Sequence, residues 1–575
     1  MFGKAGADAV VEEMKQLDYR QCIKPTVASE LTREEKRRAL KYLMYLKQKR
    51  CGRIKGRGCA DGRKQRLYKS KEETSAPTVA PEALFLTSII DAQEKRKVMT
   101  IDIPGAFMQS DIDELIHIKL EGPMAELLTK VDPKKYRPYL TEEKGKPVMY
   151  VELSKALYGT LQGAILFWKN LSGFLVEELG FELNPYDSCV ANKIINGKQC
   201  TIIWHVDDLK LSHVEQSVLE EIARKLNAKY GQETPLTIHR GLVHEYLGMT
   251  IDYSVEGKVI FTMPDYIKKL LEECPTDMDG TAVSPAANHL FDVNENAEKL
   301  DGDKANEYHH LTAKLLYLCK RVRPDLNPAV AFLCTRVKQP DVDDWKKLRR
   351  CIRYLRDTKD LPFTLEAGED IAIKWWIDAS FAVHPDMRSH TGAAMSLGKG
   401  CPISISRKQR LNTKSSTEAE LVGVDDGMPL VVWVRNFLIA QGFAVTDNVV
   451  YQDNQSAMLL ERNGRASSGR RTRHINIRYF FVSDRIKQKE LRVEYCPTED
   501  MVADLLTKPL QGSLFRKLRR LLLNLPDDAM VANPKASQEC VGSRSYADVV
   551  RGTDGGIATS TDAPESANRN RPQQQ

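Results

Sequence analysis

The segment Thr201–Ser212, which reads TIIWHVDDLKLS, constrains the fold of this chain more than any other. An apolar run leads into Asp207 and Asp208 and a second apolar run leaves them, which predicts a β-hairpin with two acids at its tip. Paired acids are commonly just a solvated turn, and the chain has further pairs at Asp343-Asp344, Asp425-Asp426 and Asp527-Asp528. The apolar flanks distinguish the first pair and make it a candidate catalytic site.

A third acid follows an apolar run farther upstream. In Thr100–Ser110, TIDIPGAFMQS, Asp102 ends a β-like run and Phe107 stands five residues later. A third carboxylate near the hairpin tip would complete a site for two divalent cations, because Mg²⁺ prefers carboxylate oxygens together with substrate phosphates. Two such ions, roughly 4 Å apart, activate an attacking hydroxyl and stabilise the leaving group, which is the chemistry of phosphoryl transfer.

The length and the pattern of elements predict several α+β domains. The chain has 575 residues, more than one hydrophobic core organises. Short β-rich runs alternate with helical stretches, at Val98–Ile103, Ile116–Leu120, Met149–Leu153, Cys200–Val206 and Leu209–Ser212, with a helix over Val214–Tyr230. Upstream, Ser29 is a candidate cap for a helix over Glu34–Lys49, and downstream Tyr308–Arg356 is rich in helix formers.

A second β-rich region begins at Ile371. Three β runs precede a helix from Ser416 and a strand over Asn448–Gln452, and this order predicts a mixed sheet. Four acids stand near strand ends or in helical stretches of this region, namely Asp378, Glu420, Asp453 and Asp504. Glu418 is the alternative to Glu420 in the helical stretch. Residues two apart cannot share one helical face, so only one of the two can face the other three acids.

Composition excludes several classes of protein. The twelve cysteines include no CxxC pair, which argues against a zinc site. No apolar run is long enough to span a bilayer and the N-terminus lacks an apolar signal core. We therefore expect an intracellular protein, in the cytoplasm, a virus-like particle or the nucleus, with no membrane partner. Fifteen Lys or Arg stand against one acid between Lys36 and Lys71, which fits either a solvated face or a polyanionic partner.

A series of short motifs surrounds the acids in a fixed order. ALYG, HVDD, YLGM, YHHLTAKLLYL and RPDL begin at Ala156, His205, Tyr246, Tyr308 and Arg323. KSSTEAEL, DNQSA, RHINIRYFF and ADLLTK follow, beginning at Lys414, Asp453, Arg473 and Ala503. Over roughly residues 40 to 510 this series resembles the reverse transcriptase and ribonuclease H of copia-type (Pseudoviridae) LTR retrotransposon polyproteins.

The resemblance implies an α+β multidomain fold. A right-hand polymerase with fingers, palm and thumb-like elements would precede a ribonuclease H-like mixed α/β domain. We divide the chain into an N-terminal and fingers region (1–97), the palm with neighbouring elements (98–300), a helical connection (301–370), the ribonuclease H domain (371–510) and a basic, then disordered tail (511–575). The basic run Arg462–Arg473 is either a phosphate-contacting loop or a solvated one.

The resemblance also assigns the metal ligands. Two Mg²⁺ ions, with Mn²⁺ as the alternative, are expected in each active site. In the polymerase site they would be held by Asp102, Asp207 and Asp208. In the ribonuclease site the ligands would be Asp378, Glu420, Asp453 and Asp504, with Glu420 favoured over Glu418.

Four further residues match substrate-binding positions of the family. Phe107 matches the steric gate that excludes a ribose 2′-hydroxyl, although it is alternatively a plain core residue. KGRGCADG at Lys55–Gly62 resembles the fingers segment, so Arg57 matches the Arg near the incoming triphosphate, and guanidinium groups bind phosphate bidentately. Gly159 and Gln162 match the segment that lines the nucleotide pocket and the template.

The implied function is an RNA-directed DNA polymerase with ribonuclease H activity. Its partners would be RNA and DNA template-primers, RNA–DNA hybrids and deoxynucleoside triphosphates. Two features depart from the family, because His205 replaces an aromatic residue and YGTLQGA at Tyr158–Ala164 lacks the usual Lys and Pro. The rival hypothesis is a catalytically inactive nucleic-acid-binding remnant of a decayed retrotransposon, and the retention of all seven acids argues against it.

Overall fold

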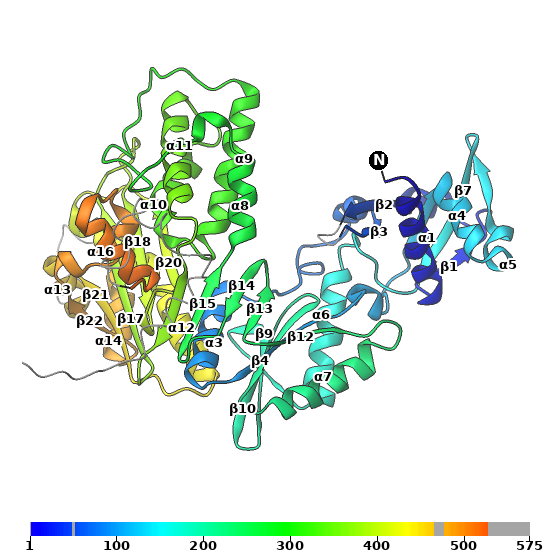
Figure 1. The fold of residues 1–575 in the computed structure, drawn as a ribbon, viewed down its shortest axis with the longest axis horizontal. Helices are drawn as coiled ribbons and strands as arrows, with labels where there is room; N and C mark the ends of the chain where they lie inside the picture. Colours follow the sequence, from blue (N-terminus) through cyan, green and yellow to red (C-terminus); the bar gives the residue numbers. More distant parts are fainter. Residues whose placement is uncertain (1, 49–51, 465–475, 527–575) are drawn as a thin grey trace, which may run out of the picture. The chain divides into compact units, whose positions relative to one another are not determined.

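The computed structural model describes residues 2–48, 52–464 and 476–526 (Figure 1). Its contacts group Met1–Leu525 into one unit, so the domain boundaries inside that unit remain a prediction. The tail after Pro526 lies outside the described residues, as does most of the basic run Arg462–Arg473. Within the described ranges, no helix is both long and apolar enough to cross a membrane.

The first sheet is six-stranded and combines strands of the predicted fingers region (1–97) with strands from the start of the predicted palm region (98–300). Its order is β1-β7-β5-β2-β3, with β6 paired to β7. The strands are β1 (Ile23–Thr26), β2 (Leu40–Gln48), β3 (Ile54–Ala60), β5 (His117–Glu121), β6 (Thr141–Glu143) and β7 (Lys146–Leu153). The helices of this region are α1 (Gly3–Tyr19), α2 (Arg33–Arg38), α4 (Pro123–Val131) and α5 (Pro133–Tyr136). Helix α1 packs against β3 at the edge of the sheet.

The predicted helix over Glu34–Lys49 is wrong beyond Arg38. Helix α2 is capped by Thr32 rather than Ser29, through a reciprocal capping box with Glu35. The chain then enters β2, which pairs with β3 and β5. The apolar residues that suggested a continued helix instead form a strand, because pairing with two neighbours overrides local helix propensity.

The second sheet carries the predicted acidic hairpin. Its order is β12-β4-β11-β10-β9-β8, with β4 (Lys97–Asp102), β8 (Glu182–Asn184), β9 (Asp187–Ile195), β10 (Lys198–His205), β11 (Asp208–His213) and β12 (Thr237–Gly241). The helices of this region are α3 (Pro81–Gln93), α6 (Gly163–Gly173) and α7 (Gln216–Tyr230). The β runs predicted at Val98–Ile103, Cys200–Val206 and Leu209–Ser212 and the helix over Val214–Tyr230 are confirmed here, and the other two predicted runs correspond to β5 and β7 of the first sheet.

The third sheet joins segments separated by more than a hundred residues. Its order is β13-β14-β15-β16-β19, with β13 (Val243–Tyr246), β14 (Met249–Asp252), β15 (Lys258–Thr262), β16 (Phe363–Ala367) and β19 (Gly398–Lys399). Four helices lie between β15 and β16 in sequence, namely α8 (Pro264–Glu272), α9 (Gly302–Cys319), α10 (Asn327–Arg336) and α11 (Val342–Asp357). The helical character predicted for Tyr308–Arg356 is confirmed.

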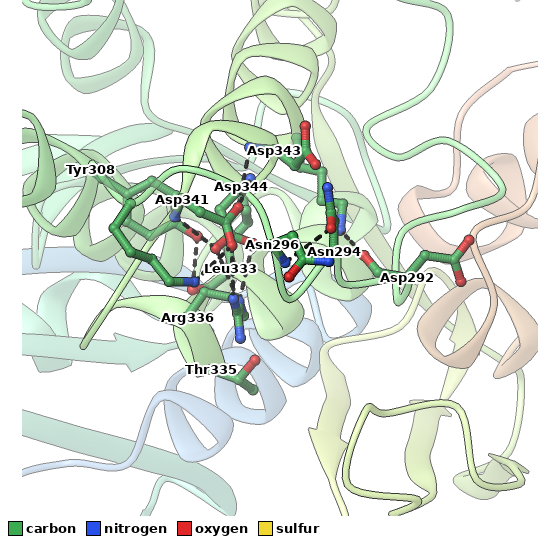
Figure 2. Close-up of polar contacts among 12 residues, drawn as sticks. Asp292, Asn294, Asn296, Tyr308, Leu333, Thr335, Arg336, Asp341, Asp343 and Asp344 are labelled. Atoms are coloured by element: carbon green, nitrogen blue, oxygen red, sulfur yellow. Dashed lines mark hydrogen bonds and ion pairs between the residues drawn. The ribbon is translucent and has the colours of Figure 1, made fainter.

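One of the other acidic pairs has a structural role at the start of α11. The Asp341 side chain accepts from the amides of Asp343 and Asp344, and the Asp344 side chain accepts in return from the Asp341 amide (Figure 2). Arg336 is ion-paired with both Asp341 and Asp344. The pair Asp343-Asp344 is therefore part of a helix cap, in contrast to the pair at the hairpin tip.

The fourth sheet is mixed, as predicted. Its order is β20-β18-β17-β21-β22, with β17 (Ala372–Ser380), β18 (His390–Ser396), β20 (Ile403–Lys408), β21 (Asp447–Gln452) and β22 (Arg492–Tyr495). Strand β17 pairs antiparallel with β18 and parallel with β21. Helix α12 (Ser416–Ala440) packs on β17 and β18, and the remaining helices are α13 (Gln455–Asn463), α14 (Asn476–Lys487), α15 (Asp504–Thr507) and α16 (Gly512–Leu523). The predicted α+β multidomain class is confirmed.

Candidate active sites

Three carboxylates meet at the tip of the β10–β11 hairpin. The strand register places Asp208 of β11 directly opposite Asp102 of β4, and Thr237 of β12 lies on the other side of Asp102. Asp207 lies in the turn, where its carbonyl accepts from the Ile103 amide at 3.0 Å. The sheet therefore brings together the three acids that the sequence singled out.

The turn that carries Asp207 has a strained backbone. Val206 has φ +59°, a conformation that β-branched residues rarely adopt. Tyr246, on the third sheet, donates its hydroxyl to the carbonyl of Asp208 at 3.2 Å. Backbone strain of this kind persists only where surrounding structure enforces it, and it concentrates at functional sites.

Electrostatics at the hairpin tip favour a bound cation. Burial raises the pKa of Asp208 to about 6, and the charges of Asp207 and Asp102 act in the same direction. Burial also raises the pKa of Asp207, with Asp102 adding to the shift and Arg57 opposing it. A divalent cation would offset this crowding of negative charge, and an all-carboxylate donor set fits Mg²⁺.

A cavity of about 410 Å³ adjoins the three acids, and both Asp102 and Asp207 line it. Arg57 and Tyr158 line the same cavity, and the guanidinium carbon of Arg57 lies 4.9 Å from the centre of the Tyr158 ring. The cavity thus combines carboxylates that suit a metal ion with a guanidinium that suits phosphate.

Helix α1 forms a wall of this cavity that the sequence analysis missed. Glu13 lines the cavity and accepts a hydrogen bond from the amide of Gly58 at 2.8 Å. A Cβ at position 56 would lie 2.6 Å from the carbonyl of Ala9, so Gly56 permits the close approach of α1. The glycines of the KGRGCADG segment were a signal of close backbone packing, but nothing in the sequence identified the partner.

Phe107 and Gly159 flank the cavity without lining it. The ring of Phe107 packs on Tyr158 with centroids 4.6 Å apart. Gly159 has φ +88°, and a Cβ there would lie 2.1 Å from the carbonyl of Ala60. Both residues therefore help to position Tyr158, which lines the cavity.

Gln162 is buried, and its amide is engaged with two side chains. It donates to Glu114 at 2.6 Å and accepts from Gln65 at 2.8 Å. Gln65 in turn accepts from the amide of Leu161 at 3.0 Å. This network ties the segment after Gly159 to the segment after β3, so the observed contacts of Gln162 are structural.

A second acidic cluster lies on the fourth sheet. Asp378 on β17, Glu420 on α12 and Asp453 after β21 offer carboxylate oxygens that all lie within 4.8 Å of one another. Burial raises the pKa of Glu420 well above its usual range, and the charges of Asp378 and Asp453 add to the shift. These three carboxylates again form a donor set suited to a divalent cation.

Asp504 joins this cluster through Lys508. The Lys508 ammonium lies 2.6 Å from a carboxylate oxygen of Asp504 and 3.4 Å from one of Asp378. Burial raises the pKa of Asp504 to about 7, with the charge of Asp378 as the next cause. The i,i+4 spacing of Asp504 and Lys508 in the ADLLTK motif was a sequence signal for this ion pair.

Glu418 and Glu420 occupy different environments. The Glu418 carboxylate accepts from the Lys414 amide at 2.8 Å at the start of α12, whereas Glu420 is buried and accepts from the Gln452 side chain at 3.3 Å. The geometry therefore places Glu420 in the acidic cluster and Glu418 at the helix terminus.

Comparisons with known proteins find relatives of the region that contains Asp102, Asp207 and Asp208. Residues 28–286 match the family model described as reverse transcriptase (RNA-dependent DNA polymerase). The chain is 25% identical over 499 residues to the retrovirus-related Pol polyprotein from transposon TNT 1-94 of Nicotiana tabacum, covering 84% of this chain and 36% of the relative. It is 26% identical over 472 residues to that from transposon RE2 of Arabidopsis thaliana, covering 81% and 30%.

The chain thus spans about a third of the length of these relatives. A solved foamy viral protease-reverse transcriptase in complex with double-stranded DNA aligns with a TM-score of 0.48 and 13% identity, covering 86% of this chain and 70% of that one. Residues 28–286 thus match the reverse transcriptase family model, and the chain is similar to Pol polyproteins of copia-type retrotransposons.

Proposed function

We propose that this chain is an RNA-directed DNA polymerase that also cleaves RNA in RNA–DNA hybrids. The observation that carries the first activity is the meeting of Asp102, Asp207 and Asp208 at one end of a sheet, beside a cavity that also contains Arg57. The match of residues 28–286 to the reverse transcriptase family model supports DNA synthesis as the reaction at this site.

The three acids would hold two Mg²⁺ ions, or Mn²⁺ as the alternative, and bound ions of this kind supply activation of the primer hydroxyl and stabilisation of the leaving group. Arg57 would bind the phosphates of the incoming deoxynucleoside triphosphate through its planar guanidinium. Phe107, whose ring packs on Tyr158 at the edge of the cavity, would be the steric gate that leaves no space for a ribose 2′-hydroxyl. Gly159 and Gln162 would hold the segment that supports this pocket and the template.

The second activity rests on the separate cluster of Asp378, Glu420 and Asp453, joined by Asp504. Its carboxylates would hold two further Mg²⁺ ions, with water as the nucleophile on an RNA phosphate. The mixed sheet that carries the cluster matches the ribonuclease H-like fold expected from the KSSTEAEL and DNQSA motifs.

The deciding experiment is extension of a DNA primer on an RNA template by the purified chain with deoxynucleotides and Mg²⁺. We expect extension that stops when EDTA removes the metal, and release of short RNA fragments when the RNA strand of the hybrid is labelled. Tight binding of the template-primer without extension would instead favour the catalytically inactive remnant.

A further inference from the structure

A cavity lies outside both acidic clusters, between a loop and helix α11. The loop from Thr281 to Asn294 and helix α11 line a space of about 690 Å³, which we call the α11 cleft. The loop lies in a stretch without helix or strand between Met278 and Gly302, and loops of that length in ordered domains are commonly functional. Leu290 and Phe291 are buried, so the loop is a packed wall.

Helix α11 brings a concentration of positive charge to this cleft. Five of the lining residues are cations, namely Lys346, Lys347, Arg349, Arg350 and Arg353, against the two acids Asp292 and Asp343 (labelled in Figure 2). Asp343 is ion-paired with Lys346 at 2.7 Å. In the described part of the chain, the other four cations have no carboxylate within ion-pair distance.

Two of the guanidinium groups also have unused hydrogen-bond donors. Arg350 donates to the Ser284 hydroxyl at 3.0 Å and Arg353 donates to the Asp277 carbonyl at 3.3 Å. The Nε atoms of Arg350 and Arg353 are buried without an acceptor among the described residues. Because a buried donor without a partner is costly, these groups are suited to an anionic ligand.

We infer that the α11 cleft binds successive phosphates of a nucleic-acid strand, an inference that rests on the proposed function. From Lys346 to Arg353 the helix rises about 10 Å, over which one strand of a duplex advances by about three phosphates. Pro285, Ala286 and Leu290 give the opposite wall an apolar surface, which suits the sugar face of a strand. Several phosphates on one strand match this spread of charge better than a single free phosphate does.

Contacts of Gln511 link the cleft to the second acidic cluster. Gln511 accepts from the Ser284 hydroxyl at 2.7 Å and donates to the Ala286 carbonyl at 2.7 Å. It stands seven residues after Asp504, a separation that an extended chain spans in at most about 25 Å. The wall of the cleft at Ser284 and Ala286 is therefore joined to that cluster by a short segment, and we expect hybrid cleavage to depend on the cleft more than nucleotide addition does.

The test is the salt dependence of binding of a labelled RNA–DNA hybrid to the full chain, measured by fluorescence anisotropy. The variant R349Q/R350Q/R353Q removes three cleft charges. The matched control R224Q/K225Q/K229Q removes three charges from α7. Each lost phosphate contact on duplex DNA lowers the log–log salt slope by about 0.9, so we expect the slope of the cleft variant to become shallower by about 2 to 3, with affinity at least about tenfold weaker at roughly 0.1 M salt. The control should keep the parental slope.

A second variant, K346Q/R349Q, changes side chains that are exposed or only partly buried, and its slope should fall by about 1 to 2 if the first variant does not fold. A folded cleft variant with the parental slope would overturn the inference alone. Parental protein that binds no hybrid would overturn the proposed function as well. Displacement of the hybrid by inorganic phosphate at constant ionic strength would show a single-phosphate site and would overturn strand binding.

Discussion

Replacing Asp208 by Asn should stabilise the metal-free protein while abolishing primer extension. The pKa of Asp208 is about 6 in the folded chain, against about 3.9 for an unperturbed Asp. One pKa unit corresponds to about 1.4 kcal/mol, so the ionised carboxylate destabilises the folded state by up to about 3 kcal/mol above pH 6.

The sign of the pH dependence follows from the direction of this shift. Because the folded-state pKa is raised, the folded protein holds the Asp208 proton to higher pH than the unfolded chain does. The contribution to stability is present below about pH 4 and is lost as the pH rises through about 6. Asn does not titrate, so the advantage of the variant over the parent should grow by about 2 kcal/mol between pH 4.5 and pH 8.

Urea unfolding in EDTA at these two pH values measures this difference. Asp113→Asn is the matched control, because Asp113 is an exposed acid in a loop, and it should leave the difference unchanged. Mg²⁺ should reduce the difference in the free energy of unfolding between the parent and Asp208→Asn, because it stabilises the parent. Equal unfolding midpoints for parent and variant at both pH values would refute the argument that Asp208 is electrostatically crowded, and extension by the variant would refute its role as a ligand.

Six further substitutions at five residues test individual roles. Asp207→Asn should abolish extension and leave hybrid cleavage intact, and Asp453→Asn should do the reverse; loss of both activities in either folded protein would contradict two separate sites. Arg57→Ala should raise the KM for deoxynucleotides by about tenfold or more, since a charged hydrogen bond contributes about 1.5–3 kcal/mol, with little change in template affinity; an unaltered nucleotide dependence would remove Arg57 from the site. Phe107→Ala should admit ribonucleotides, as measured by their incorporation relative to deoxynucleotides, and parental discrimination would make Phe107 a core residue only. Glu13→Ala should raise the KM for deoxynucleotides several-fold, because the amide of Gly58, next to Arg57, loses the carboxylate that accepts its hydrogen bond. Glu13→Gln keeps an acceptor at this position and should resemble the parent. Equal effects of the two substitutions would argue against a role for this hydrogen bond.

The hairpin with its three acids could be predicted because its signals are local. The alternation of apolar runs around Asp207 and Asp208 specifies two strands and a tight turn, and Asp102 ends another apolar run. Only the pairing of β4 with β11, which joins distant segments, could not be predicted from local sequence. The order of elements around Asp378, Glu420 and Asp453 was predictable for the same reason.

The first sheet was less predictable, because long-range pairing decides its structure. Leu40–Gln48 contains residues that suit a helix as well as a strand, and its partner β3 is needed to settle the choice. The contact of Glu13 with Gly58 joins residues 45 apart in sequence, and the α11 cleft joins the loop Thr281–Asn294 to a helix that begins only at Val342. No local sequence pattern indicates these long-range contacts.

The two acidic clusters differ in how their concentrated negative charge is balanced. Among the described residues, the cluster of Asp102, Asp207 and Asp208 has no Lys or Arg in ion-pair contact, and Arg57 acts on it only across the cavity. In the second cluster the ammonium of Lys508 contacts Asp504 and Asp378 directly. Burial alone would lower the pKa of Lys508, but these carboxylates outweigh burial and raise it. A divalent cation at the hairpin tip would therefore meet carboxylates that no ammonium among the described residues contacts, whereas in the second cluster it would share Asp378 and Asp504 with Lys508. We therefore expect the affinity of the second cluster for metal to depend on the position of the Lys508 side chain, which follows the short helix α15 and precedes the segment that leads to Gln511 and the α11 cleft.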